Sequence, residues 1–157
     1  MTPREAEIII DTVRCWVEER DDLRALALAG SWARGNPKPS SDLDLLIVAQ
    51  YPEAYRLPDH WLCDIPFAKA EFEIDRYATC RYGSVWSCHI ILKPEAEVEL
   101  TFAPPAWAQI NPMDPGTRLV VADALRAIVD KDEALRRLFA AAHASAAPDA
   151  LPQGPPR

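Results

Sequence analysis

The stretch that decides the fold runs from Gly30 to Asp44 and reads Gly-Ser-Trp-Ala-Arg-Gly-Asn-Pro-Lys-Pro-Ser-Ser-Asp-Leu-Asp. It follows the apolar run Leu23–Ala29, which is short and ends at glycine, as is typical of a buried strand. It ends on two carboxylates that open a second predicted strand, Ser41–Ala49. A Gly-Ser turn between two such strands, followed closely by Asp-x-Asp, favours a site for a nucleoside triphosphate and its metal ions.

The first half of this stretch has the properties of a phosphate-binding turn. Gly30 can adopt backbone angles closed to other residues and lets a phosphate approach the main chain. Ser31 adds a hydroxyl, and the residues after it can begin a helical turn, whose unpaired amides attract anions. Arg34 adds a permanent positive charge with a forked donor geometry that fits phosphate. We therefore expect Gly30, Ser31 and Arg34 to bind the phosphates of a nucleotide.

The second half places two carboxylates on one side of a strand. Side chains two apart on a strand share a face, so Asp42 and Asp44 point the same way, with Cα atoms roughly 6.7 Å apart. Two carboxylates on one face repel each other unless a cation bridges them, and Mg²⁺ prefers carboxylate and phosphate oxygens. Two-metal phosphoryl transfer holds its ions about 3.5–4 Å apart, which such a pair can span with one more carboxylate. An isolated Asp-x-Asp is more often a solvated strand face or a turn, so the interpretation depends on its place after the Gly-Ser turn.

A third acidic residue is available on the run Glu97–Phe102, which alternates strictly between polar and apolar side chains. Adjacent strands lie about 4.8 Å apart, close enough for one of its carboxylates to join the aspartates. Glu99 is the first candidate and Glu97 the second, while the acidic run at 71–75 is a third possibility. The glutamates that bind no metal are then the solvated face of an antiparallel sheet.

His89 lies on the predicted strand Val85–Leu92, which precedes Glu97. A connecting turn of three residues would pair His89 with Glu99, whereas a turn of two or four residues would pair Ile90 with Glu99. A shift of one residue reverses every side chain, and the sequence leaves this register open. The sequence favours a core or rim position for His89 over a catalytic or substrate-binding role.

The residues Gly30–Gly35 and Ser41–Leu45 closely resemble the nucleotidyltransferase signature of the DNA polymerase β superfamily. They are most similar to the small prokaryotic minimal nucleotidyltransferases and their antibiotic-modifying relatives, and the separation of eleven positions between Ser31 and Asp42 also matches. The resemblance covers Leu23 to about Phe102. It implies an α/β (α+β) polymerase-β-like fold, with a mixed sheet of about five strands flanked by helices that lie mainly on one face.

The resemblance also implies a function. The implied function is that of a metal-dependent enzyme. Such an enzyme moves a nucleoside monophosphate from a nucleoside triphosphate to an acceptor hydroxyl on a small molecule or a protein, and releases pyrophosphate. Asp42, Asp44 and Glu99 (or Glu97) would hold one or two Mg²⁺, and ATP is the expected nucleotide by family habit. The alternative is a non-catalytic or regulatory, antitoxin-like nucleotide-binding module that acts through a partner protein. The intact Gly-Ser and Asp-x-Asp argue against loss of catalysis, and the acceptor stays open.

Composition limits the other possibilities. The chain has 157 residues with 49% apolar content, which predicts one domain over residues 1–147 and a proline-rich disordered tail over 148–157. The formal net charge of −7 argues against sequence-independent binding of nucleic acid. The four cysteines form no Cys-x-x-Cys pair, and no signal peptide or bilayer-length apolar run is visible. We therefore expect a cytoplasmic protein with reduced thiols and no membrane contact.

The pattern of apolar residues and prolines predicts the remaining elements. These are a helix over Arg4–Arg20, a loop with a short helix over Tyr51–Pro66, strands over Phe67–Asp75, Val85–Leu92 and Glu97–Phe102, and a final helix over Asp132–Ala147. Arg118–Ile128 is predicted either as a helix or as a helix that runs into a short strand, Arg126–Asp130.

Overall fold

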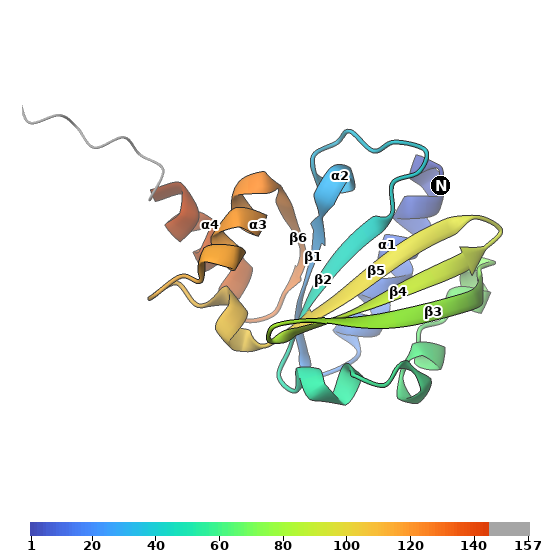
Figure 1. Ribbon diagram of the computed structural model, residues 1–157, viewed down its shortest axis with the longest axis horizontal. Coiled ribbons are helices and arrows are strands. Elements are labelled where there is room, and N and C mark those ends of the chain that lie inside the picture. The colour runs from blue at the N-terminus through green and yellow to red at the C-terminus, as the bar shows by residue number, and fades with distance from the viewer. Residues whose placement is uncertain (145–157) are drawn as a thin grey trace, which may run out of the picture.

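The computed structural model describes residues 1–144 and places a six-stranded mixed sheet at the centre of the molecule (Figure 1). The strands are β1 (Leu23–Ala29), β2 (Leu43–Ala49), β3 (Glu73–Tyr82), β4 (Val85–Lys93), β5 (Ala96–Ala103) and β6 (Leu125–Asp130). Their order across the sheet is β3-β4-β5-β2-β1-β6, and only the β2–β5 pair is parallel. The predicted α/β class with a mixed sheet is confirmed, with β6 as a sixth strand.

Four α-helices and five short 3₁₀ segments complete the described chain. They are α1 (Pro3–Glu18), α2 (Gly30–Ala33), α3 (Pro115–Asp123) and α4 (Ala134–Ala144), with η1 (Pro52–Tyr55), η2 (Pro58–His60), η3 (Leu62–Asp64), η4 (Phe67–Ala70) and η5 (Pro105–Ala108). The start of α1 is fixed by a capping box, in which the Glu5 amide donates to the Thr2 hydroxyl and the Thr2 amide donates to the Glu5 carboxylate. None of the helices in residues 1–144 is both long and apolar enough to cross a bilayer.

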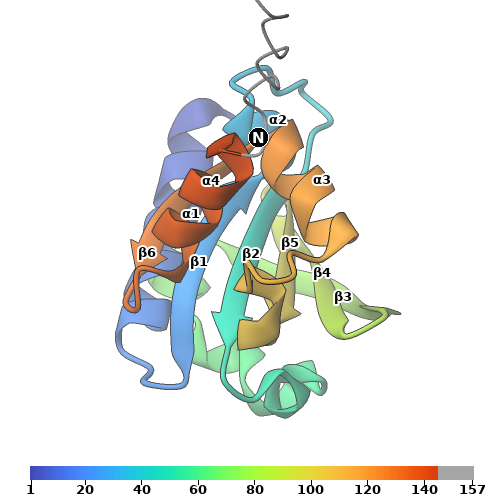
Figure 2. The same ribbon diagram turned by 90° about the vertical axis from the view of Figure 1, so that its left-hand side faces the viewer.

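Helices cover both faces of the sheet, so the prediction of helices mainly on one face is wrong. Figure 2 shows α3 and α4 over the face of β1 and β2 that is opposite to α1. Leu26 and Leu28 of β1 pack in the core beneath α1, whereas Ala25 and Ala27 pack in the core beneath α4. The alternation of leucine and alanine makes both faces of β1 apolar, so each face needs its own cover.

The predicted strand over Phe67–Asp75 is wrong in its first half. Residues Phe67–Ala70 form η4, which ends at Glu71 in the left-handed conformation (φ 64°), and β3 begins at Glu73. Phe67 and Phe72 are both buried in the same core. Residues five apart on a strand would point to opposite faces, so only a turn allows both rings to be buried on one side.

The C-terminal elements follow the second alternative for Arg118–Ile128, because α3 is followed directly by β6. The described part of the final helix is α4, in which Leu135 and Leu138 are buried against β1 and β2. Residues 145–147 of the predicted helix and the predicted tail at 148–157 lie outside the described residues. The extent of the domain and the tail therefore stay predictions.

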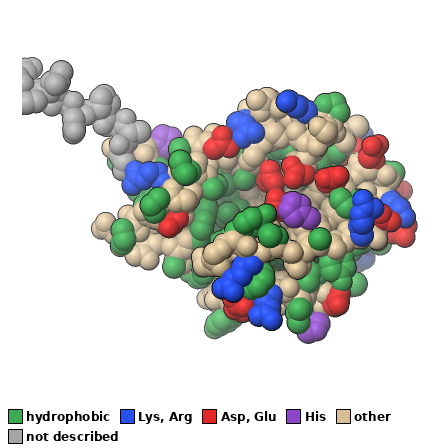
Figure 3. Space-filling view, viewed as in Figure 1, with side chains coloured by type: hydrophobic (Ala, Val, Ile, Leu, Met, Phe, Trp, Pro, Cys, Tyr) green, Lys and Arg blue, Asp and Glu red, His purple; other side chains and the backbone are tan. Residues whose placement is uncertain are grey.

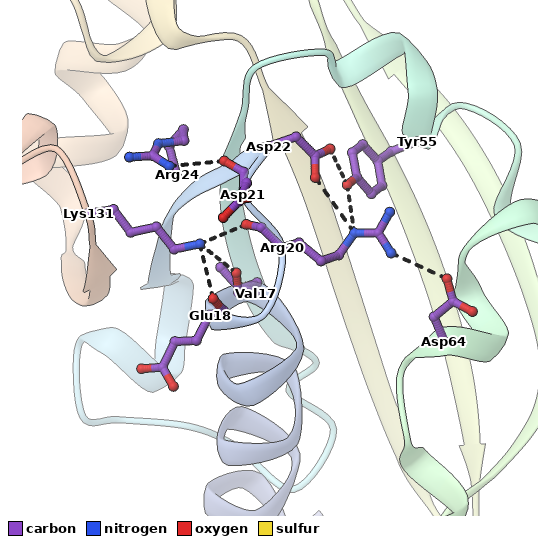
Figure 4. Close-up of polar contacts among 9 residues, drawn as sticks. All are labelled: Val17, Glu18, Arg20, Asp21, Asp22, Arg24, Tyr55, Asp64 and Lys131. Atoms are coloured by element: carbon purple, nitrogen blue, oxygen red, sulfur yellow. Dashed lines mark hydrogen bonds and ion pairs between the residues drawn. The ribbon is translucent and has the colours of Figure 1, made fainter.

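A lysine holds the C-terminal end of α1 against the sheet (Figure 4). The Lys131 ammonium donates hydrogen bonds to the backbone carbonyls of Val17 at 2.9 Å, Glu18 at 3.4 Å and Arg20 at 2.7 Å. Helix ends leave such carbonyls without intrahelical partners, and a cation there is also favoured by the helix dipole. Burial of the ammonium lowers the pKa of Lys131.

A second polar network lies beside this lysine, at the start of β1 (Figure 4). Arg20 donates from Nε to the Tyr55 hydroxyl at 3.1 Å and from a terminal nitrogen to the Asp64 carboxylate at 3.3 Å. The Tyr55 hydroxyl donates in turn to Asp22 at 2.5 Å. Burial of the phenol, reinforced by its bond to Asp22, raises the pKa of Tyr55. Each charge in this network therefore has an opposite charge or a donor beside it.

Candidate active site

Three polar side chains form a row across β2, β5 and β4. Asp44 of β2 pairs in register with Glu99 of β5, and Glu99 pairs with His89 of β4. The connection from β4 to β5 leaves three residues, 93–95, between the paired Leu92 and Ala96, which is the register that brings His89 to Glu99. Figure 3 shows acidic side chains gathered beside a histidine on the open part of this face.

Asp42 joins this row from the residue before Leu43, the first of β2. One carboxylate oxygen of Asp42, one imidazole nitrogen of His89 and one carboxylate oxygen of Glu99 all lie within 4.8 Å of one another. The His89 Nε2 atom is 3.3 Å from the Glu99 Oε1 atom. Among residues 1–144, this is the only group of three or more such side chains close enough to share a metal ion.

The electrostatics of Asp44 show that the carboxylates are crowded together. Burial, followed by the negative charges of Asp42 and Glu99, raises the pKa of Asp44 from 3.8 to about 7, and His89 acts in the opposite direction. Like charges that share a site disfavour ionisation in this way. The structure thus brings Asp42, Asp44 and Glu99 together, and a cation would relieve their repulsion.

Gly30 fits between β1 and the Asp44 side chain. Its φ is +65°, and a Cβ atom at this position would lie 2.1 Å from the Asp44 Oδ2 atom. Any side chain here would therefore both strain the backbone and collide with the carboxylate. The chain continues into α2, a single turn in which Ser31 is partly buried. The Gly-Ser turn and the first carboxylate of β2 are consequently in direct contact.

Arg34 is placed differently from the other predicted phosphate ligands. Its guanidinium forms an ion pair with Asp123, the last residue of α3. The two side chains are 39% and 54% exposed. The structure therefore joins Arg34 to α3 and leaves the pair accessible to solvent. No sequence pattern indicated Asp123, because the two residues lie far apart in the chain.

The rival acidic residues lie outside the group. Glu97 is exposed on β5, where its register partner is Ile91, and it lines a shallow groove together with Ser41. The run at 71–75 lies at the start of β3, the strand at the edge of the sheet. There Asp75 accepts a hydrogen bond from Lys93 at 2.7 Å, which lowers the pKa of Asp75. Among the candidates, Glu99 is the residue beside Asp44.

His89 is the residue whose place the sequence left open. Its side chain is 45% exposed at the rim of the site, whereas that of Glu99 is 19% exposed. In the sequence, the partner of His89 depended on the length of the turn before Glu97. That length depends on where each strand ends. Those ends are set by pairing between strands, so the sequence left the register undecided.

The sequence pattern of the nucleotidyltransferase domain family matches residues 10–103. The match includes β1, the Gly30–Asp44 stretch and all of β5. The chain therefore belongs to the nucleotidyltransferase domain family, which confirms the resemblance to the DNA polymerase β superfamily.

Curated protein sequences give no significant match to the chain. Among solved structures, the chain is similar to the Cid1 poly(U) polymerase in a mutant form bound to MgATP, with 16% sequence identity and a TM-score of 0.40. The similar region covers 65% of this chain and 33% of that chain.

Proposed function

We propose that this protein transfers a nucleoside monophosphate from a nucleoside triphosphate to an acceptor hydroxyl and releases pyrophosphate. The observation that supports the proposal is the convergence of Asp42, Asp44 and Glu99 beside the Gly30 turn. Carboxylates placed together on one rigid sheet, next to a glycine that leaves the backbone open, suit a triphosphate and its metal ions.

The donor set fits a divalent cation. Asp42, Asp44 and Glu99 would hold one or two Mg²⁺. Burial and then the negative charges of Asp42 and Glu99 raise the pKa of Asp44, and a cation would offset these neighbouring charges. When bound, Mg²⁺ supplies charge stabilisation at the phosphoryl group that is transferred. Gly30 is required for this arrangement, because a side chain at that position would displace the Asp44 carboxylate.

The remaining residues bind the substrates and handle the proton. The Ser31 hydroxyl and the amides beside Gly30 donate to the β- and γ-phosphates. The Arg34 guanidinium exchanges its exposed partner Asp123 for a phosphate. The acceptor oxygen forms a bond to the α-phosphorus, the bond from that phosphorus to the β-phosphate oxygen breaks, and pyrophosphate leaves. Glu99 accepts the proton of the acceptor hydroxyl. Catalysis is then mostly positioning and charge stabilisation.

For the acceptor, we propose a chemical class of molecule. A net charge of −7 favours a cationic small molecule such as an aminoglycoside, because an acidic surface steers cations toward it. A partner protein is the other acceptor to test. ATP is the first nucleotide to test.

The test uses nucleoside triphosphates labelled at either the α- or the γ-phosphate. Purified protein is incubated with Mg²⁺, each of ATP, GTP, CTP and UTP, and either a panel of aminoglycosides or a cell lysate. We expect label from the α-phosphate to move to an acceptor and γ-label to leave as pyrophosphate. Transfer of the γ-label alone would indicate a kinase-type reaction and refute the mechanism.

The same assay separates catalysis from regulation by binding. If nucleotide binds in the presence of Mg²⁺ but neither label moves to any acceptor, the protein is a nucleotide-binding module that acts through a partner. Equilibrium dialysis with labelled ATP measures that binding directly. The Asp42→Asn/Asp44→Asn variant serves as the negative control in both measurements.

A further inference from the structure

We infer that His89 is a direct ligand of the divalent ion held by Asp42 and Glu99, and that it makes this position favour a first-row transition ion such as Mn²⁺ over Mg²⁺. This inference rests on the proposed function, since it takes the carboxylates to be metal ligands. It goes further because it assigns a nitrogen donor to the site and predicts which metal the site prefers.

The geometry places three donors around one point. Asp42 precedes β2, Glu99 lies on β5 and His89 lies on β4, so the donors come from three neighbouring segments of the chain. Their donor atoms lie within 4.8 Å of one another. An ion bound at about 2.1–2.3 Å from each ligand atom would hold such atoms no more than about 4.6 Å apart, so small side-chain shifts suffice.

The backbone holds these donors in place. Glu99 lies between Asp44 on one neighbouring strand and His89 on the other, in continuous sheet register. Two residues along each strand, the Ser87 and Thr101 hydroxyls share a hydrogen bond of 2.7 Å on the same face. The His89 imidazole is 45% exposed, so an ion can reach it from solvent without opening the core.

The donor chemistry sets the preferred metal. Mg²⁺ is a hard cation that takes oxygen ligands and gains little from an imidazole. First-row transition ions accept imidazole nitrogen readily, and mixed sets of histidine and carboxylate are typical of their sites. The nitrogen of His89 beside the oxygens of Asp42 and Glu99 therefore adds affinity for Mn²⁺ and little for Mg²⁺.

The other two histidines provide internal controls. His60 is exposed on η2, and His143 contacts the carbonyl of Phe139 at 2.7 Å on α4. Neither belongs to the group of donors around Asp42. A nitrogen signal at a bound metal ion can therefore be assigned by replacing one histidine at a time.

The direct test is pulsed electron paramagnetic resonance of the protein with Mn²⁺ alone. We expect the imidazole nitrogen to modulate the electron spin echo in the wild type and in His60→Ala, and the modulation to disappear in His89→Ala. Mn²⁺ bound without nitrogen modulation in the wild type, or modulation that persists in His89→Ala, would overturn the inference.

Affinity separates a ligand from a residue that only positions Glu99. Calorimetric titration should show Mn²⁺ binding weakened about tenfold in His89→Ala, with Mg²⁺ binding changed by less than about twofold. His89→Gln keeps a hydrogen-bond donor for Glu99 but removes the imidazole, so it should lose Mn²⁺ affinity equally. Full Mn²⁺ affinity in His89→Gln would show that His89 only positions Glu99, against the inference.

The outcomes distinguish this inference from the proposed function. If the wild type binds both ions, shows no nitrogen modulation and loses both in Asp42→Asn/Asp44→Asn, the inference fails and the proposed function stands. If the wild type binds neither Mn²⁺ nor Mg²⁺, both fail. Because the His89 side chain is half exposed, its replacement should leave the thermal midpoint unchanged, which circular dichroism checks.

Discussion

The two ends of β1 and β2 carry polar clusters of opposite character. At one end, Asp42, Asp44 and Glu99 place like charges together, and the pKa of Asp44 rises to about 7. At the other end, Lys131 contacts three backbone carbonyls, and Arg20 lies among carboxylates and a phenol (Figure 4).

The two clusters differ in how their charges are compensated, and this difference separates a functional site from a structural network. In the Arg20 and Lys131 networks, each charged side chain has its partner within the described chain. Within residues 1–144, only His89 offsets the effect of the neighbouring carboxylates on Asp44. A strongly shifted pKa of this kind, on the open part of a sheet, is characteristic of functional residues.

The largest effect is expected from removing charge at the site. Asp42→Asn/Asp44→Asn should lower the rate of nucleotidyl transfer by about a thousandfold or more, because metal and phosphate binding are lost together. The fold should remain, as judged by circular dichroism. The matched control is Asp11→Asn/Asp75→Asn, which removes two carboxylates that form ion pairs outside the site. Undiminished transfer in the site variant would refute the assignment.

The opposite cluster should respond in stability instead of activity. Lys131→Met removes the three hydrogen bonds that the ammonium donates at the end of α1 and should lower the free energy of unfolding by about 1–3 kcal/mol. The Val17 and Arg20 carbonyls keep the backbone amides of Arg20 and Leu23 as donors. Urea denaturation measures this, and the rate per folded molecule should stay close to wild type. Lys69→Met, at an exposed position on η4, is the control for loss of charge. Equal stability of the two variants would show that the Lys131 contacts contribute nothing.

Removing one charge at the site should stabilise the metal-free protein. The folded-state pKa of Asp44 is raised above its ordinary value, so the folded protein keeps a proton that the unfolded chain releases. The stability from this group is fully present below the ordinary pKa of 3.8 and is lost as the pH rises to about 7. With EDTA at pH 8, Asp44→Asn should therefore be more stable than wild type by about 1–2 kcal/mol, after allowance for partial solvent exposure.

This gain should vanish near pH 3, below the ordinary pKa of 3.8, where Asp44 is protonated in both states. Adding Mg²⁺ at pH 8 should raise the thermal midpoint of the wild type and leave that of Asp44→Asn nearly unchanged. A variant that is less stable than wild type at pH 8 without metal would contradict the view that these carboxylates repel one another.

The smallest effect concerns the pair of Arg34 and Asp123. If Arg34 exchanges Asp123 for a phosphate, Arg34→Ala should weaken nucleotide binding about three- to tenfold. Asp123→Asn frees the guanidinium and should leave binding unchanged or tighter. Calorimetry with a non-hydrolysable triphosphate measures both variants. Equal weakening in the two would instead show that the pair acts by holding α3 in place.

Local sequence signals were sufficient where each residue's role depends on its near neighbours. The Gly30–Asp44 stretch and its flanks predicted a strand over Leu23–Ala29, a turn, and a strand over Ser41–Ala49. The structure has all three, with the second strand beginning at Leu43 instead of Ser41. Alternation placed Glu97 and Glu99 on the same face of one strand, with Glu99 as the first candidate, and the pairing between strands puts Glu99 beside Asp44. The same logic failed at Phe67–Asp75, because the apolar pattern there arises from a turn that buries Phe67 and Phe72 together.

Local sequence patterns alone established the family and the Gly-Ser turn, because these depend on a short run of residues and on the backbone freedom of glycine. The shared side of Asp42 and Asp44 stays a prediction, since β2 begins at Leu43 and Asp42 precedes it. Tertiary structure decided that His89 meets Glu99, that Arg34 pairs with Asp123, and that helices cover both faces of β1. Each of these depends on strand register or on packing between distant segments. Strand register is fixed only when the whole sheet forms, and a shift of one residue would turn every side chain of a strand to the opposite face.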